Sequence, residues 1–160
     1  MADHRLVDIK LDDSTVVRWS ADIDHERRIA IYDLLEENSF ELLKSSRETY
    51  QGPYKLLLSV VEGRLAFDVG CQGEQPLYSF RLAMSPFRRI IREYFAICDS
   101  YYEAIKSATP SKIEAIDMGR RGIHNEGSEL LMERLADKVK VDFQTARRLF
   151  TLVCVLHMKG

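Results

Sequence analysis

One long stretch constrains the fold of this chain more than any other. Residues 109–135 read TPSKIEAIDMGRRGIHNEGSELLMERL and repeat apolar residues every three or four positions, as the buried face of an α-helix does. Thr109 followed by Pro110 is a typical helix start, because threonine can cap the first free N–H groups and proline has no N–H to leave unpaired. The pattern predicts a long helix with a polar cluster in its middle.

Three glycines interrupt this helical pattern: Gly119, Gly122 and Gly127. Each glycine inside a helix costs roughly 1 kcal/mol relative to alanine, so one alternative is a loop around the first two, with Asn125 capping a second helix. Because the apolar phase is the same on both sides of the glycines, we favour one continuous or kinked helix. In that helix Gly127 would let another backbone come close beside His124.

The polar cluster consists of Asp117, Arg120, Arg121 and His124. Spacings of three and four residues let side chains touch along a helix. One interpretation is a buried network that fixes the helix register, in which Asp117 pairs with Arg120. A second is an anion site, in which the arginines bind phosphate or carboxylate, His124 is the acid/base or a phosphoacceptor, and Asp117 orients it. A third is a set of interface residues.

Other arginines are weaker candidates for anion binding. Arg88 and Arg89 fall in the first turns of the preceding helix, where the helix dipole disfavours cations. A bound anion would remove this conflict, although a solvated face or ion pairs with glutamates such as Glu93 is the simpler explanation. The pair Arg147 and Arg148, on the last helix, has the same ambiguity.

The other elements follow from the period of the apolar residues. Alternation in the N-terminal half predicts strands, and spacings of three and four in the C-terminal half predict helices. Ser85-Pro86 repeats the cap-plus-proline start, Asp142 is expected to cap the last helix, and Asn38 is expected to stop the first helix in a left-handed conformation. Strands are expected at 5–11, 40–43, 54–61, 64–70 and 76–83, helices at about 22–37, 85–107, 110–135 and 143–156, and an irregular link at Val16, Val17 and Trp19.

These elements predict an α+β fold with an N-terminal strand and helix, a three-stranded antiparallel meander, and a C-terminal helical layer with a long antiparallel helical hairpin. The meander has a tight turn at Glu62-Gly63, and one of its faces must be covered by the helices. We expect residues 1–160 to form a single domain, in which 1–84 are mostly β with one helix and 85–157 are helical.

Composition excludes several classes of protein. Residues 85–160 hold 13 Lys+Arg against 10 Asp+Glu, an excess far below the density of positive charge that a nucleic-acid partner would require. No apolar run approaches the roughly 18 residues that span a membrane or resembles a signal peptide. Cys71, Cys98 and Cys154 lack a C-x-x-C spacing and are expected to be reduced thiols in the core. Reduced thiols indicate a cytoplasmic protein. With its histidines far apart in sequence, the chain is expected to hold no metal, and no cofactor is expected.

Several segments together resemble a known family. SPFRRIIREYF at 85–95, SYYEAI at 100–105, ATPSKIEAIDMGRRGIHNEG at 108–127 and DFQTARRLFTLVCVL at 142–156 are similar to the bacterial uncharacterised protein family 0262. The likeness covers nearly the whole chain from residue 25 onward. It implies a bacterial, cytosolic protein of about this length, and it carries no catalytic residue over to this chain.

The sequence therefore leaves two functions open. The first is a small cytosolic regulatory or interaction protein without chemistry of its own, acting through its C-terminal helical face as a homodimer or with a protein partner. The alternative is an enzyme or binding protein for a phosphorylated or carboxylate small molecule, using the Asp/Arg/Arg/His cluster. The distinguishing observation is whether His124 and the paired arginines line a solvent-reachable pocket.

Overall fold

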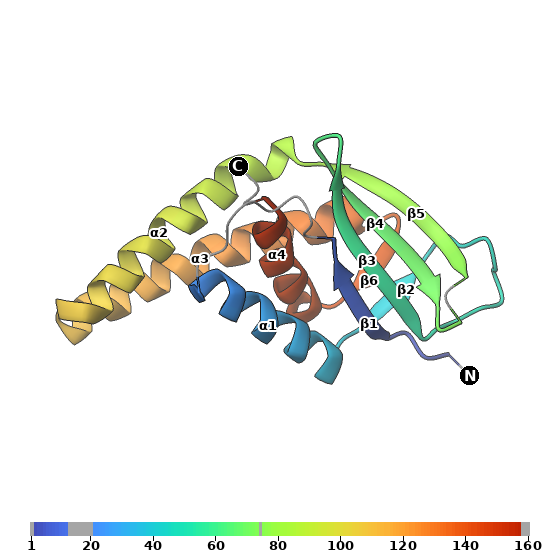
Figure 1. Ribbon diagram of the computed structural model, residues 1–160, viewed down its shortest axis with the longest axis horizontal. Helices are drawn as coiled ribbons and strands as arrows, with labels where there is room; N and C mark the ends of the chain where they lie inside the picture. Colours follow the sequence, from blue (N-terminus) through green and yellow to red (C-terminus); the bar gives the residue numbers. More distant parts are fainter. Residues whose placement is uncertain (1, 13–20, 74, 158–160) are drawn as a thin grey trace.

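The structure consists mainly of a sheet and a layer of helices (Figure 1). It is a computed structural model that describes residues 2–12, 21–73 and 75–157. The order of the strands and helices confirms the predicted α+β fold. The elements are β1 (Leu6–Leu11), α1 (Ala21–Glu36), β2 (Phe40–Leu42), β3 (Tyr54–Val61), β4 (Arg64–Cys71), β5 (Pro76–Ala83), the short 3-10 helix η1 (Ser85–Phe87), α2 (Arg88–Ser107), α3 (Pro110–Leu135), β6 (Val139–Val141) and α4 (Phe143–His157).

The main sheet has the strand order β1-β3-β4-β5. Strands β3, β4 and β5 form the predicted antiparallel meander, with Glu62 and Gly63 both at positive φ in the first turn. The predicted N-terminal strand joins this meander as a parallel edge strand beside β3, so the sheet has four strands instead of three. The short β2 pairs with β6, a strand that was not predicted.

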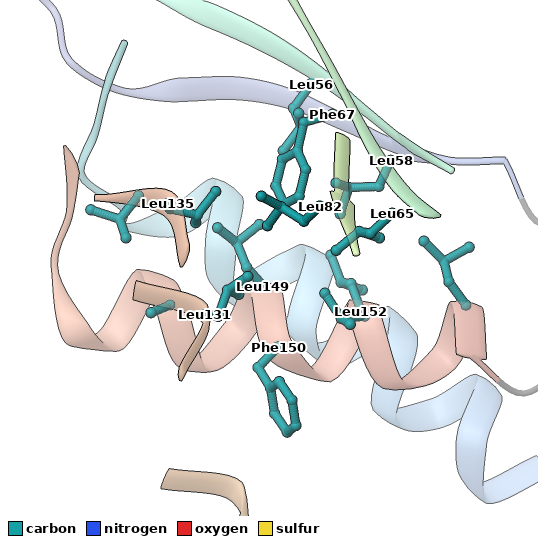
Figure 2. Close-up of a cluster of buried hydrophobic side chains, with 14 of the residues drawn as sticks. Leu56, Leu58, Leu65, Phe67, Leu82, Leu131, Leu135, Leu149, Phe150 and Leu152 are labelled. Atoms are coloured by element: carbon teal, nitrogen blue, oxygen red, sulfur yellow. The ribbon is translucent and has the colours of Figure 1, made fainter. Parts of the chain in front are cut away.

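The hydrophobic core lies between one face of the sheet and the helices α3 and α4 (Figure 2). Leu58, Phe67 and Phe80 lie opposite one another on β3, β4 and β5, and the two phenylalanine rings stack at 4.8 Å. Leu131 of α3 and Leu149 of α4 are fully buried beneath this face. The meander face that was expected to need a helical cover therefore has one.

Helices α2 and α3 form the predicted antiparallel hairpin, whose far end projects away from the sheet (Figure 1). The Thr109 hydroxyl accepts a hydrogen bond from the Lys112 N–H at 3.3 Å, as expected for a cap. Helix α3 continues without interruption through Gly119 and Gly122, so the loop alternative is wrong. The expected Ser85 cap is also wrong, because Ser85 begins the 3-10 turn η1 and α2 starts three residues later.

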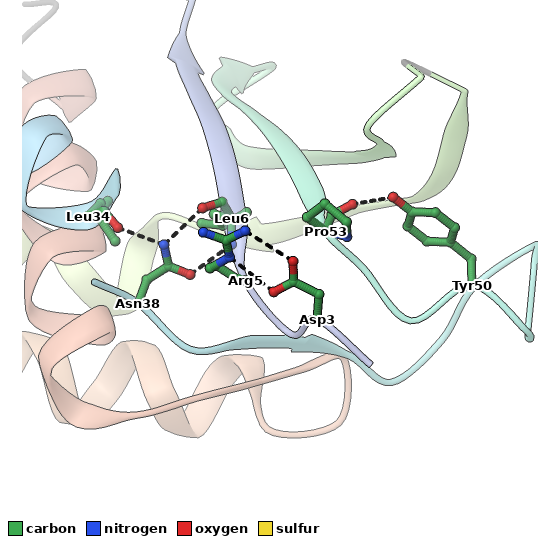
Figure 3. A network of polar contacts seen from close by, with 7 residues as sticks. All are labelled: Asp3, Arg5, Leu6, Leu34, Asn38, Tyr50 and Pro53. Carbon is green, nitrogen blue, oxygen red and sulfur yellow. Dashed lines mark hydrogen bonds and ion pairs between the residues drawn. The ribbon is translucent and has the colours of Figure 1, made fainter. Parts of the chain in front are cut away.

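Asn38 ends α1 through its side chain (Figure 3). Its amide donates to the carbonyl oxygens of Leu34 and Leu6, at 2.6 and 3.0 Å, and its oxygen accepts from the Leu6 N–H at 2.7 Å. The expected left-handed stop is wrong, since Glu62 is the one non-glycine residue at positive φ in the described part of the chain. One side chain thus fixes the end of α1 to the edge strand β1.

Other local expectations have mixed outcomes. Asp142 caps α4, accepting from the Thr145 N–H at 2.8 Å, as predicted. Cys71, Cys98 and Cys154 are buried and unpaired, as expected of core thiols. The irregular link expected at residues 16–19 lies outside the described residues.

Candidate functional site

A groove of about 480 Å³ lies between α1 and α3 and is open to solvent. Helix α4 packs against both of these helices and forms the floor between them (Figure 1). One stripe of α4 faces the groove, because Gln144, Arg147, Arg148 and Thr151 recur at spacings of three and four. Tyr94 of α2 also lines it.

The wall formed by α3 carries three of the four predicted residues: Arg120, Arg121 and His124. The fourth, Asp117, holds the two arginines, with its oxygens 2.6 Å from the Arg120 Nη2 and 2.6 Å from the Arg121 Nη2. These bonds, the one from Arg120 above all, hold the pKa of the Asp117 carboxyl below its usual range. The expected pairing of Asp117 with Arg120 is present, and the pair lies at the edge of an open groove.

The Arg120 side chain is held on two sides. Its guanidinium carbon lies 4.3 Å from the centre of the Tyr101 ring, within the range of cation–π attraction. Asp117 binds its Nε and Nη2. By contrast, the Arg121 side chain is 68% exposed. The α3 wall therefore offers one guanidinium held on two sides and one exposed guanidinium held by Asp117 alone.

His124 is buried at the inner end of this wall, with 8% of its surface exposed. Its Nε2 lies 2.8 Å from the Thr151 hydroxyl, which donates its own hydrogen to the Arg147 carbonyl at 3.3 Å. The hydroxyl therefore accepts from His124, which assigns the imidazole hydrogen to Nε2. The expectation that Asp117 orients His124 is wrong, because the contact of Nε2 is with Thr151 and the carboxylate is used by the arginines.

The environment of His124 keeps its imidazole neutral. Burial, reinforced by the nearby charges of Arg147 and Arg120, lowers the pKa of His124 to about 4. At neutral pH the ring is thus a neutral hydrogen-bonding group. This state favours the role of a binding or structural residue over that of a proton donor in catalysis.

The His124 ring packs edge-on between two aromatic rings. The ring centres of Tyr94 and Phe150 lie 5.3 and 5.2 Å from that of His124. A methyl group at Gly127 would come within 2.1 Å of the Phe150 ring. Gly127 thus makes room beside His124 for an aromatic side chain, and not for a backbone as expected.

The floor contributes two further arginines. Arg148 donates from Nη1 to the Glu37 carbonyl at 3.0 Å and so holds the end of α1 on α4. The Arg147 Nε is buried and has no hydrogen-bond partner, and no carboxylate among the described residues pairs with its guanidinium. The sequence showed these arginines only as an adjacent basic pair, far along the chain from the predicted cluster.

The opposite wall, formed by α1, carries negative charge. Glu26 and Asp33 lie two helical turns apart on one stripe, with Ile29 and Ala30 between them. Glu26 accepts a hydrogen bond from the Tyr102 hydroxyl at 2.9 Å. Sequence reasoning missed this wall, although the spacing of seven residues between the two carboxylates was available as a signal.

Arg88 and Arg89 do not join this groove. Arg89 binds Glu93 at 3.1 Å and Glu126 of α3 at 3.2 Å. The pair with Glu93, which was weighed in the sequence, accounts for Arg89 together with Glu126, which was not, and Arg88 is exposed in the first turn of α2. The structure therefore separates these two arginines from the cluster on α3.

The described residues offer neither a metal site nor a membrane-spanning helix. Among them, no group of three or more histidine, cysteine, aspartate or glutamate side chains is arranged to hold a metal ion. In the same part of the chain, every helix is too short or too polar to cross a bilayer.

Comparison with known proteins identifies the family of the chain. A UPF0262 protein of Erythrobacter litoralis is 58% identical over 160 residues, which is the full length of both chains. UPF0262 proteins of Novosphingobium aromaticivorans and Agrobacterium fabrum are each 56% identical and are matched over 100% and 98% of their lengths, by 100% and 99% of this chain. No solved structure matches the chain. The family model described as "Uncharacterised protein family (UPF0262)" matches residues 3–159, and the chain therefore belongs to this family.

Proposed function

We propose that this protein is a small cytoplasmic binding protein that takes a phosphorylated or carboxylate small molecule in the groove between α1 and α3. The observation that carries the proposal is the convergence of four arginines from two helices on one open groove, Arg120 and Arg121 from α3 and Arg147 and Arg148 from α4. Guanidinium groups match the planar oxygens of phosphate and carboxylate, often with two parallel hydrogen bonds.

The state of Arg147 supports this proposal most directly. A half-buried guanidinium without a carboxylate partner in the described chain is unfavourable, because its charge is partly removed from water. A bound anion would supply that partner. Arg120 and Arg121 already share Asp117, so they add a smaller attraction and a fixed geometry.

The state of His124 favours a binding protein over an enzyme. Its pKa of about 4 leaves the imidazole neutral, and its Nε2 hydrogen bond goes to Thr151. A proton donor or phosphoacceptor at neutral pH would need a more exposed ring with a pKa closer to the working pH. An anion bound beside His124 would raise its pKa, since it would offset the charges of Arg147 and Arg120.

The test is a thermal-shift screen at constant ionic strength, with chloride as the reference salt and inorganic phosphate, sugar phosphates, nucleoside monophosphates and di- and tricarboxylates as probes. A ligand at one hundred times its Kd stabilises the folded state by about 2.7 kcal/mol, or roughly 5–11 °C in melting temperature for a chain of this size. We expect at least one probe to reach this shift with the wild type.

Matched variants locate the site. Arg147→Gln is expected to abolish the shift and to retain the fold, because no carboxylate of the described chain depends on Arg147. Arg89→Gln removes an arginine of equal charge that is paired outside the groove, and it should leave the shift unchanged. The proposal fails if no probe stabilises the wild type, or if both variants respond alike.

A second candidate function is the interaction role expected from the sequence, as a homodimer. It is favoured by two apolar side chains that are exposed on the hairpin, Ile105 at 51% and Met118 at 65%. Burying them against a second copy would remove apolar surface from water. Light scattering after size-exclusion chromatography tests this candidate, with a dimer expected for the wild type and a monomer for Met118→Glu. A wild-type monomer at high concentration would rule it out.

A further inference from the structure

The groove has walls of opposite charge. Glu26 and Asp33 lie on the α1 side, and the arginines lie on the α3 side and on the floor. Among the described residues no ion pair joins the α1 carboxylates to Arg147 or Arg148, although all of these residues line one cavity. The two sets of charges therefore face the same space without touching.

This separation has an energetic consequence for any ligand. A simple anion gains attraction from the arginines, and in the same groove it is repelled by the two carboxylates. A molecule with a positive group at its other end would be attracted at both ends. Opposite charges on the two sides of one pocket thus favour a dipolar ligand and act against a purely anionic one.

The chemistry of the α1 wall fits such a positive group. The Tyr102 hydroxyl occupies one oxygen of Glu26 at 2.9 Å and leaves the other available. The Asp33 carboxylate has no hydrogen bond or ion pair within the described chain. Between the two carboxylates the wall is apolar, with Ile29 and Ala30 at the surface of the groove, where methylene groups of a ligand can pack.

We propose that the groove binds a zwitterionic small molecule, whose phosphate or carboxylate contacts the arginines and whose ammonium group contacts the α1 wall at Asp33. This inference rests on the proposed anion-binding function and adds the class of ligand to it. The α3 and α4 side chains supply affinity for the anion, and the α1 wall selects ligands that also carry a cation.

The test compares two series of probes by isothermal titration calorimetry. The first series is ω-aminoalkyl phosphates with short spacers of increasing length, and the second is alkyl phosphates with the same spacers. The wild type is expected to bind the best aminoalkyl phosphate at least about fivefold more tightly than its alkyl counterpart, as one added ion pair in a partly buried site predicts.

Variants of α1 assign the preference to the acidic wall. Asp33→Asn should remove most of the preference and should leave the affinity for alkyl phosphates equal or higher. Glu36→Gln removes an exposed carboxylate of the same helix that lies outside the groove, and it should keep the preference. Thermal unfolding in the absence of ligand checks that both variants fold like the wild type.

The outcomes separate this inference from the function on which it rests. If alkyl phosphates bind as tightly as aminoalkyl phosphates at every spacer length, the anion site stands and the zwitterionic ligand is refuted. If the preference persists in Asp33→Asn and in Glu26→Gln, the acidic wall does not select the ligand and the inference is also refuted. If neither series binds, both the proposed function and this inference fall.

Discussion

Replacing two glycines of α3 by alanine should change stability in opposite directions. Gly122 and Gly127 both lie inside the same helix, so the intrinsic preference for alanine, about 1 kcal/mol, is the same at each position. A methyl group at Gly122 would meet no atom within 4 Å other than those of its chain neighbours and of the nearby backbone of its own helix. Gly122→Ala should therefore stabilise the protein by about 0.5–1 kcal/mol.

At Gly127 the same methyl group would overlap a buried ring. Its carbon would lie 2.1 Å from the Phe150 Cζ and 2.5 Å from two further ring carbons, whereas carbon atoms in contact are about 3.5–4.0 Å apart. Phe150 is fully buried, so the ring has no open space to enter. Overpacking of this kind costs about 1–3 kcal/mol or more, which exceeds the gain in helix preference.

Urea unfolding followed by far-ultraviolet circular dichroism measures both effects. Because the helix preference is the same at both positions, the free energies of unfolding of the two variants should differ by the overpacking cost, about 1–3 kcal/mol or more, with similar m-values. Combining Gly127→Ala with Phe150→Leu provides a control, because the leucine should cost less in the alanine background than in the wild type. If both alanine variants shift stability in the same direction, the close packing of Phe150 on α3 is refuted.

Three further predictions concern other parts of the fold. As pH falls from about 6.5 toward 4, the free energy of unfolding of the wild type should fall by up to about 3 kcal/mol, because the unfolded chain binds a proton on His124 that the folded chain does not. His124→Gln should not show this loss. Equal slopes of the free energy of unfolding against pH for the two proteins would contradict this prediction. Asn38→Ala should lower the free energy of unfolding by about 2 kcal/mol, since it leaves the Leu6 N–H and two carbonyls unpaired. Asn38→Asp should lower it at least as much, because its carboxylate would face those carbonyls. An Asn38→Asp variant as stable as the wild type in urea unfolding would refute these hydrogen bonds. Asp142→Ala should cost about 1 kcal/mol by losing the bond from the Thr145 N–H, and a thermal melt that matches the wild type would count against the cap.

The parts of the fold that depend on neighbours in sequence could be predicted. The apolar phase of residues 110–135 identified α3 despite its glycines, because burial of a continuous stripe outweighs a few unfavourable backbone preferences. The alternation in β3, β4 and β5 and the Glu62-Gly63 turn identified the meander for the same reason.

Contacts between distant segments could not be predicted. Strand β6 has three residues, too few to show an alternation, and it exists because β2 lies beside it. The parallel pairing of β1 with β3 likewise produces no pattern in the sequence of either strand. The prediction for Asn38 was wrong because it used only the residues of the helix, whereas the Asn38 side chain binds the backbone of β1.

In the candidate site, too, contacts within one helix could be predicted and contacts between helices could not. The spacing of three residues correctly joined Asp117 to Arg120 on one helix face. The partner of His124 comes from α4, so no spacing within α3 could identify Thr151. For the same reason the acidic wall of α1 and the arginines of α4 became part of the groove only when the helices were packed together.

The buried cysteines make the chain well suited to site-selective labelling. Cys98 and Cys154 are shielded from reagents, and burial raises the pKa of both thiols, to about 11 for Cys98, so neither supplies a thiolate at neutral pH. Cys71 is also buried. A cysteine introduced at exposed Tyr32, the chain neighbour of the groove residue Asp33, would therefore react first with a maleimide fluorophore, which would label α1 without removal of any native thiol.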